Sequence, residues 1–474
     1  MTLVAGVDTS TQSCKIVVRD AHTGAELRSG AASHPDGTEC HPDHWWTAYL
    51  EAVERAGGLE DVEAVSVGGQ QHGMVCLDED GEVVRPALLW NDNRSAESAQ
   101  DLTRELGQQA WAEACGSVLV ASFTVTKLRW LRDAEPGNAA RVAAVCLPHD
   151  WLSWRIAGHG PKSQGGDGDL SALFTDRSDA SGTGYWSPFT GDYRLDLLET
   201  AFGACPQVPR VVGVNEAGGR TPWGALIGPG AGDNAAAAFG LGLVPGDVSI
   251  SLGTSGVVSA ISPMPTADSS GVVAGFADAS GSFLPLVCTL NAARIIDVGT
   301  RILSISYDEI AAMALSAPAG AEGLRLVPYF EGERTPPLPH ATAALHGMTL
   351  SNCTPQNMAR AFVEALLCCQ AEGLAAISAQ GFEPSRVFLI GGGAKSPAIR
   401  QIAPSVFGHE VVVPPTGEYV AIGAARQAAW VLSGEEVPPV WVIEGYETFS
   451  GTYAPVIREQ YAEVRELIHS HASS

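Results

Sequence analysis

The chain repeats one local pattern near its start and again near its middle. Alternating apolar residues predict strands at 3–7 and 13–18 around a polar turn, and strands at 248–252 and 257–261 around a turn of small residues. Segments with helical spacing follow each pair of strands. The repetition favours a duplicated α/β architecture with two domains, and 474 residues are enough for two cores.

The predicted domains are residues 1–240 and 241–474, because glycines and a proline at 240–246 separate a predicted helix at 235–239 from the strand at 248–252. Further strands are predicted at 62–67 and 386–390. Further helices are predicted at 45–56, 96–106, 126–133, 356–378, 420–433 and 455–469. The stretch 158–184 is rich in Gly, Ser and Asp, which predicts a long mobile loop that could act as a lid.

The charge of the chain restricts its partners. Lys and Arg total 28 against 53 Asp and Glu, a formal net charge of -25, and no basic cluster offsets it. Nucleic acid and anionic membranes are therefore disfavoured as partners. If the ligand is a nucleotide, backbone N–H groups, hydroxyls and a divalent cation must hold most of its phosphate charge.

The remaining composition predicts a cytoplasmic protein. The N-terminus has no basic leader, and no uninterrupted apolar stretch approaches the ~20 residues of a membrane span. The 10 cysteines are scattered without a CxxC pair, which indicates reduced thiols rather than a disulfide framework.

Two hairpin turns are candidate phosphate sites. The first, residues 8–15, offers hydroxyls, backbone N–H groups and the carboxylate of Asp8, which could order the water shell of Mg²⁺. The second, residues 253–256, offers hydroxyls and backbone N–H groups but no carboxylate. Either turn alone could be an ordinary hairpin rich in Ser and Thr. Their corresponding positions in a duplicated chain favour a shared role.

A third turn, residues 391–396, follows a predicted strand and contains three consecutive glycines, which let a flat ligand such as adenosine approach the backbone. It does not fit the Walker A pattern, since Leu389 and Ala394 stand where glycines are required. A dinucleotide fold is excluded because the glycines do not lie in a first βαβ unit. The alternative is a simple turn into a helix.

Two further segments could bind and activate a polyol. Asp233 could accept a proton from an attacking hydroxyl, while Asn234 caps the following alanine-rich helix; a cap without catalysis is the alternative. Gln71 and His72 follow a predicted strand, at the end where open α/β sheets bind ligands, and their polar groups suit a sugar. A lone histidine is more often structural.

Taken in order, these segments resemble the FGGY carbohydrate kinases, and within that family the xylulose kinases. The stretches that carry the resemblance are residues 6–13, 69–73, 89–92, 127–131, 232–234, 251–255, 331–336 and 391–394. The resemblance implies an actin-like ATPase (ribonuclease H-like) fold, with two α/β domains around a central cleft. It also implies Mg-ATP as phosphoryl donor and D-xylulose, phosphorylated at C5, as acceptor.

The same resemblance assigns roles to residues. It implies that Asp233 is the catalytic base, with a possible metal contact, and that Asp8 lies by the metal. It implies that the sugar contacts Gln71, His72, Asp233 and Asn234. It implies that ATP lies against Thr11, Gln12, Ser13, Gly253 and Thr254, with the adenosine on Gly392, Gly393, Ala394 and Lys395.

Three alternatives stay open on the sequence. One is a kinase for another ketopentose or polyol, such as ribulose, because many xylulose kinases have another residue where Gln71 stands. A non-catalytic sugar sensor would be expected to lack Asp8 or Asp233, and both are present. An actin-like assembly protein would have no use for a polyol site. A homodimer is possible.

Overall fold

The computed structural model describes residues 1–472 and divides into two compact units. Unit 1 contains Met1–Leu243, Pro263–Leu284 and Gly417–Val442. Unit 2 contains Val244–Ser262, Pro285–Thr416 and the chain from Ile443 onward. Two short segments from the second half of the sequence therefore fold with unit 1.

The sheet of unit 1 has the strand order β11-β12-β5-β1-β2-β3, and β13 also pairs with β5. These strands are β1 (Leu3–Thr9), β2 (Ser13–Asp20), β3 (Glu26–Ser33), β5 (Ala64–Gly69), β11 (Gly219–Arg220), β12 (Leu226–Ile227) and β13 (Ala231–Gly232). Antiparallel pairing joins β1, β2 and β3, whereas β12, β13 and β1 run parallel to β5. The sheet is therefore mixed.

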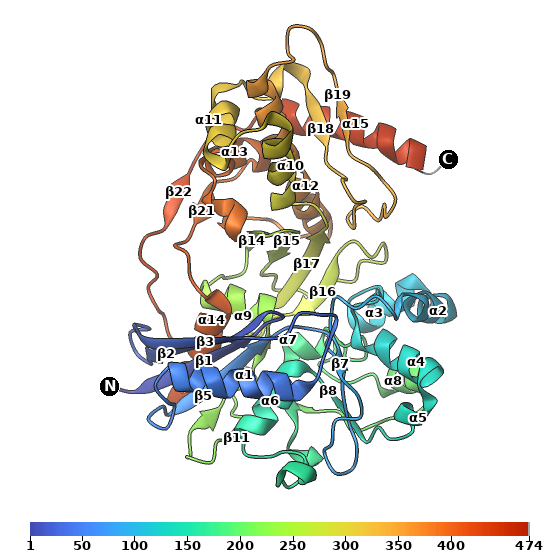
Figure 1. Ribbon diagram of the computed structural model, residues 1–474, viewed down its shortest axis with the longest axis vertical. Helices are drawn as coiled ribbons and strands as arrows, with labels where there is room; N and C mark the ends of the chain where they lie inside the picture. Colours follow the sequence, from blue (N-terminus) through green and yellow to red (C-terminus); the bar gives the residue numbers. More distant parts are fainter. Residues whose placement is uncertain (473–474) are drawn as a thin grey trace. The chain divides into compact units, whose positions relative to one another are not determined.

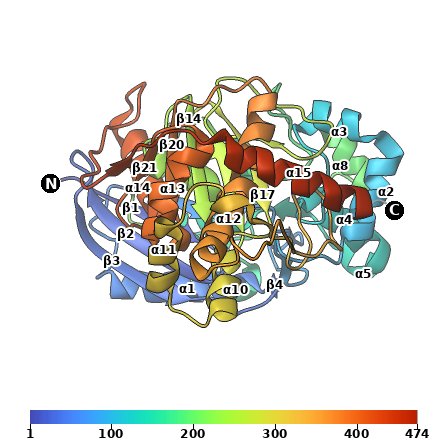
Figure 2. The same ribbon diagram turned by 90° about the horizontal axis from the view of Figure 1, so that it is seen from above.

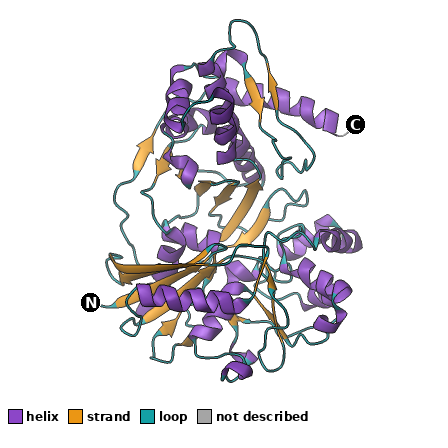
Figure 3. Cartoon of the chain, viewed as in Figure 1, coloured by secondary structure: helices purple, strands orange, loops and turns teal. Residues whose placement is uncertain are grey.

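Helices cover both faces of this sheet (Figures 1 and 3). On one face, α1 (Pro42–Arg55) and α6 (Pro148–Ile156) bury Ala5 and Val7 of β1 together with their own tryptophans. On the other face, α14 (Tyr419–Ser433) covers Val4 with its alanines and lies beside α9 (Asp233–Gly240). Side chains of β1 alternate between these two cores, as the period of a strand requires.

Small residues allow α14 to approach the sheet and α9 closely. At Gly6 in β1, a Cβ atom would overlap backbone atoms of Ala421 and Ala425. At Gly423 in α14 it would overlap the carbonyl group of Ala236 in α9. The backbones of these elements are therefore in direct contact, with no side chain between them.

The other elements of unit 1 surround this framework. The helices are α2 (Ala96–Leu106), α3 (Gln108–Cys115), α4 (Thr124–Ala134), α5 (Pro136–Ala139), α7 (Arg177–Ala180) and α8 (Leu195–Phe202). The strands are β4 (Glu39–Cys40), β6 (Val75–Leu77), β7 (Ala87–Leu88), β8 (Ala144–Cys146), β9 (Phe174–Thr175), β10 (Arg210–Val211) and β16 (Ala274–Ala277).

The prediction of one long loop at 158–184 is wrong for its second half. Residues 173–184 contain β9 and α7, and all of them except the half-buried Arg177 are buried. Their polar groups make internal hydrogen bonds instead of facing water: the Asp176 carboxylate, for example, accepts from the backbone N–H groups of Ser178 and Asp179. Residues 173–184 have a composition typical of loops, but they form a buried turn whose polar groups are hydrogen-bonded.

The sheet of unit 2 repeats the arrangement of unit 1. Its strand order is β17-β15-β14-β20-β21-β22, with the antiparallel hairpin β14–β15 beside the parallel strand β20. These strands are β14 (Asp247–Leu252), β15 (Gly256–Ala260), β17 (Phe283–Thr289), β20 (Arg386–Ile390), β21 (Val411–Val413) and β22 (Glu447–Phe449). The hairpin β1–β2 beside parallel β5 is the counterpart in unit 1, so the predicted duplication is confirmed.

Helix α12 (Pro355–Ala379) forms the centre of unit 2. It packs against α10 (Ala293–Leu303), α11 (Tyr307–Ser316), α13 (Pro397–Phe407) and α15 (Pro455–Ala472), which Figure 2 shows from above. A short pair, β18 (Arg325–Val327) and β19 (Ala344–His346), lies next to it. Among residues 1–472, α12 alone is long and apolar enough to qualify as a membrane span; 78% of its most apolar window is buried, as in the core helix of a globular unit.

The short hairpins and helices predicted from periodicity are found with small shifts. The helix predicted at 45–56 begins at Pro42, because His41 caps it and proline is favoured in a first turn. All 10 cysteines are free thiols, and Cys205 and Cys353 are exposed.

Replacing Gly6 by alanine is expected to destabilise unit 1 by about 1–3 kcal/mol, because the new methyl group must displace the backbone of α14 from the sheet. Urea unfolding followed by circular dichroism measures the effect. Gly137→Ala is the matched control, since nothing lies within 4 Å of the added Cβ atom in α5. Equal unfolding midpoints for the two variants would contradict the close approach of α14.

Candidate functional site

Three parallel strands of unit 1 end at the same edge of its sheet. Thr9, the last residue of β1, and Gly232, the last residue of β13, are both paired with Gly69 at the end of β5. The residues that follow parallel strands emerge on one side of a sheet, which is where such sheets bind ligands. This edge therefore collects the turn after β1, the residues after β5 and the start of α9.

The turn after β1 holds a buried carboxyl group at its base. Asp8 is 4% exposed and accepts a hydrogen bond from the Ser10 hydroxyl. Burial raises the pKa of Asp8 to about 6, although that hydrogen bond and the charge of Lys15 act in the opposite direction. Lys15 itself forms an ion pair with Glu418, with 2.6 Å between Nζ and Oε2.

His34 fixes the shape of the same turn. Its Nδ1 lies 2.9 Å from the Ser10 carbonyl oxygen, and its backbone N–H donates to the Gln12 carbonyl group at 2.8 Å. Because a carbonyl oxygen only accepts, Nδ1 carries the proton. These two hydrogen bonds fix the backbone of the hydroxyl-rich turn between Asp8 and Ser13.

Asp233 opens α9 at this edge. Its Oδ1 accepts from the backbone N–H and the side-chain Nδ2 of Asn234, at 2.7 and 2.8 Å. Burial raises the pKa of Asp233 to about 6, the hydrogen bonds from Asn234 oppose the shift, and the negative charge of Asp8 adds to it. The Asp8 carboxylate therefore lies close enough to Asp233 to affect its protonation.

The prediction that Asn234 caps α9 is wrong. The helix already begins at Asp233, with Gly232 as its N-cap and no side-chain cap. The reason is that β13 continues to Gly232 along β5, which moves the start of the helix one residue earlier than the alanine run indicates. Asn234 instead orients the carboxylate of Asp233.

Gln71 is buried under the start of α9. Its Nε2 donates to the Ser178 carbonyl group at 3.2 Å, and a Cβ atom at Gly232 would overlap the Gln71 side chain. Gln71 and Gly232 are thus in van der Waals contact. Gln71 therefore lies against the residue that directly precedes Asp233.

His72 is held in an unusual conformation. Its φ is 69°, a left-handed region that a non-glycine residue seldom adopts. Its carbonyl group accepts from Lys127 Nζ and Thr124 Oγ1, each at 3.1 Å, and its ring packs against the rings of Phe123 and Phe276. Such a conformation persists only where the surroundings determine it.

The protonation of His72 follows from its contacts. Nδ1 lies 2.6 Å from the Gly182 carbonyl oxygen and must donate to it. Burial lowers the pKa of His72 to about 4, so the ring is neutral near pH 7. A neutral ring with its proton on Nδ1 leaves Nε2 as a hydrogen-bond acceptor.

Two residues near the edge make contacts that the sequence did not predict. Lys127 is fully buried, burial lowers its pKa to about 7, and its ammonium group holds the carbonyl group of His72. The Trp90 indole N–H donates to Thr11 Oγ1 at 2.8 Å. Both contacts join segments more than 50 residues apart, and no local spacing in the sequence encodes such pairs.

Two buried polar atoms at this edge have no hydrogen-bond partner within residues 1–472. They are Thr9 Oγ1 and Gln70 Nε2, which belong to the ends of β1 and β5. Buried polar groups in folded proteins are nearly always paired. Unpaired ones are typical of a site that a ligand or bound water completes.

Unit 2 has a corresponding edge. The turn between β14 and β15 contains Gly253 and Thr254, and the turn after β20 contains Gly392–Lys395. Ser251 pairs with Ile390, and Gly391 and Gly393 lie against Leu252, so the two turns are neighbours. Thr254, Gly392 and Lys395 are exposed, and nothing lies within 4 Å of a Cβ atom built on Gly392. The turns predicted to contact ATP therefore share one open surface.

Comparison with protein families accounts for nearly all of the chain. Residues 3–240 match the model of the N-terminal domain of the FGGY family of carbohydrate kinases, and residues 248–432 match the model of its C-terminal domain. The xylulose kinase of Streptomyces coelicolor is 43% identical over 92% of this chain and 90% of that protein. The xylulose kinase of Escherichia coli is 31% identical, over 89% of each chain.

Solved structures agree with the sequence comparisons. The crystal structure of xylulose kinase from Bifidobacterium adolescentis matches with a TM-score of 0.93 and 52% identity, covering 98% of this chain and 99% of that one. A Plasmodium falciparum glycerol kinase with ADP, at 16% identity, shows the fold alone, with a TM-score of 0.85. The expected actin-like ATPase fold is confirmed, and the chain belongs to the FGGY family of carbohydrate kinases.

Proposed function

We propose that this kinase transfers the γ-phosphoryl group of ATP to the C5 hydroxyl of D-xylulose in the cytoplasm, giving D-xylulose 5-phosphate. The relatives named above as xylulose kinases support the choice of sugar. The observation that carries the chemistry is Asp233, an oriented carboxyl group with a raised pKa, beside Asp8 at a ligand-binding edge. In this proposal residues 1–240 bind the sugar, and residues 241–474 supply most contacts to ATP.

Asp233 acts as the general base. A pKa of about 6 leaves the carboxylate ionised near pH 7 but makes it a better proton acceptor than an ordinary aspartate. Asn234 fixes Oδ1 through two hydrogen bonds, so Oδ2 is the oxygen that takes the proton from the attacking hydroxyl. Removing that proton as the oxygen attacks phosphorus is the main chemical task left to the protein in phosphoryl transfer.

His72 and Asn234 select and orient the sugar. Because Nε2 of His72 can only accept, it recognises a hydroxyl group as donor, and the hydrogen bond from Nδ1 to Gly182 fixes the plane of the ring. The buried side chain of Gln71, which packs against Gly232, lines the proposed sugar site. A rigid acceptor next to the base aligns one hydroxyl with Asp233.

The turns hold the nucleotide. Thr11, Gln12 and Ser13 offer hydroxyl and backbone donors in unit 1, and Gly253 and Thr254 offer the same in unit 2. The backbone of Gly392, Gly393, Ala394 and Lys395 supports the adenosine, because the exposed Gly392 has no side chain to keep a flat ring away. Few basic side chains take part, in agreement with the acidic composition.

The carboxyl groups of Asp8 and Asp233 fit a divalent cation. Both are hard oxygen donors. Burial raises the pKa of both groups, and the charge of Asp8 adds to the shift at Asp233, so a nearby cation would stabilise their ionised forms. Mg²⁺ bound with ATP would supply positive charge to the transferring phosphoryl group. Asp8 would hold it through water, and Asp233 would contact it directly.

Asp233→Asn is expected to lower kcat by about 10²–10⁴-fold, because the amide keeps the shape but cannot accept the proton. The KM for ATP should change little. A coupled assay of ADP release at saturating sugar measures both. Asp308→Asn, at the first turn of α11, is the matched control and should retain full turnover. An Asp233→Asn variant with wild-type kcat would exclude Asp233 as the base.

The substrate is tested by ADP release over a panel of pentuloses, hexuloses and polyols. D-Xylulose is expected to give the highest kcat/KM, because the chain is related to xylulose kinases over nearly its whole length. A higher value for D-ribulose would assign a different ketopentose to the same site. If no sugar accelerates ADP release, a sugar-sensing role replaces the kinase.

A further inference from the structure

A buried histidine lies directly beneath the proposed sugar site, and the reaction described above does not use it. His149, the second residue of α6, is fully buried. A Cβ atom at Gly69 would lie 2.8 Å from His149 Cβ, and one at Gly230 would overlap its ring. His149 thus fills the space between the end of β5 and the segment that leads into β13.

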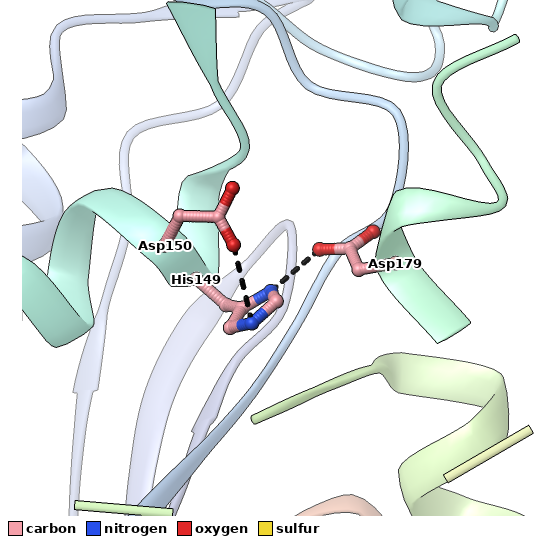
Figure 4. Close-up of side chains that lie close together, drawn as sticks. All are labelled: His149, Asp150 and Asp179. Atoms are coloured by element: carbon pink, nitrogen blue, oxygen red, sulfur yellow. Dashed lines mark hydrogen bonds and ion pairs between the residues drawn. The ribbon is translucent and has the colours of Figure 1, made fainter. Parts of the chain in front are cut away.

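Two carboxyl groups hold the ring (Figure 4). Nδ1 lies 2.6 Å from Oδ2 of Asp179 in α7, and Nε2 lies 3.3 Å from Oδ1 of Asp150. All three side chains are buried. Burial disfavours the charged ring, but the two carboxylates outweigh it and raise the pKa of His149 to about 10.

The three residues are close enough to suggest a metal site, since their ligand atoms lie within 4.8 Å of one another. Two observations argue against one. Nδ1 faces Oδ2 of Asp179, and Nε2 faces Oδ1 of Asp150 and, at 3.4 Å, the Pro229 carbonyl oxygen. All of these oxygens are acceptors, so both ring nitrogens donate and no lone pair is left for a metal ion. The ring is the cation of this cluster.

The turn that Asp179 anchors contacts the site residues directly. Ser178, the residue before Asp179, accepts from Gln71 through its carbonyl group and from the Gly232 N–H through Oγ, the latter at 3.0 Å. Four residues after Ser178, the Gly182 carbonyl group accepts from Nδ1 of His72. One short turn, residues 178–182, therefore sets the positions of Gln71, His72 and the residue before Asp233.

A fully buried ion pair is a poor device for stability alone. The cost of removing two charges from water commonly cancels their attraction, and apolar replacements of similar volume are often as stable. What a short, charge-assisted bond does provide is a fixed geometry. In this fold the bond between His149 and Asp179 fixes the turn at residues 178–182.

We propose that His149, acting through Asp179, is a positioning residue for phosphoryl transfer: it fixes the 178–182 turn, which in turn places Gln71, His72 and Asp233 for the sugar. This inference rests on the proposed function of those three residues. It assigns the buried pair to catalysis rather than to folding.

The test is Asp179→Ala in the full chain, assayed well below its unfolding temperature and normalised to folded protein by circular dichroism. We expect kcat to fall by about 10- to 100-fold, since small misplacements of reacting groups have effects of this size. The KM for sugar should rise, while the KM for ATP stays within about 2-fold. Asp179→Asn, whose amide oxygen can still accept from Nδ1, should retain activity within about 3-fold of wild type.

Glu364→Ala is the matched control. It removes the carboxylate of another buried ion pair, Arg360–Glu364, which is also 2.6 Å long and lies on α12 of unit 2. It should lower the unfolding temperature and leave kcat unchanged. If Asp179→Ala behaves in the same way, the pair serves stability and the inference is overturned.

Ser178→Ala keeps the inference testable if Asp179→Ala does not fold. It removes the acceptor for the Gly232 N–H without leaving a buried charge, and it should lower kcat with the KM for ATP unchanged. Wild-type kinetics for Ser178→Ala would overturn the inference. A wild-type enzyme that prefers another sugar would instead overturn the proposed substrate, and the same variants would then be assayed with that sugar.

Discussion

The pairing register of three parallel strands determines where chemistry can occur in unit 1. Thr9 and Gly232 align with the same residue, Gly69, so β1, β5 and β13 end together. A shift of one residue in either pair would turn the following side chains to the opposite face. This register places Asp8, near the end of β1, and Asp233, directly after β13, at the edge where β5 also ends. Gly6 and Gly423 let α14 pack directly on this framework.

The site is assembled from acids and neutral donors rather than from basic side chains. Lys15 is paired with Glu418, and Lys127 is used to hold a backbone carbonyl group. Burial raises the pKa of both Asp8 and Asp233, and the charge of Asp8 adds to the shift at Asp233. In the proposed function, this acidic site takes a nucleotide that arrives with a divalent cation, and Asp233 is the carboxylate that removes the proton from the hydroxyl.

The sequence predicted the framework well because its strands are short, apolar and separated by clear turns. β14, β20 and α2 have nearly the bounds expected from periodicity. The predictions failed where tertiary contacts override local preference. Pairing of β13 with β5 moves the start of α9 to Asp233, and buried hydrogen bonds turn the Gly- and Ser-rich segment at 173–184 into part of the core.

The sequence suggested the residues of the candidate site, but it did not suggest the residues that hold them in place. Asp8, Gln71, His72 and Asp233 stand out through their positions after strands and through the family resemblance. His34 and His149 do not, because each acts on a segment distant in the sequence. Their roles depend on packing in three dimensions, which no spacing rule expresses.

The account depends most on the basicity of Asp233, and its pKa can be measured directly. Protein labelled with ¹³C at the aspartate carboxyl carbons is titrated by NMR, with Asp233→Asn identifying the signal. The account predicts a titration near pH 6, which moves to lower pH in Asp8→Asn because a neighbouring negative charge is removed. A signal that titrates below about pH 4 in the wild-type protein, as an ordinary exposed aspartate does, would contradict it.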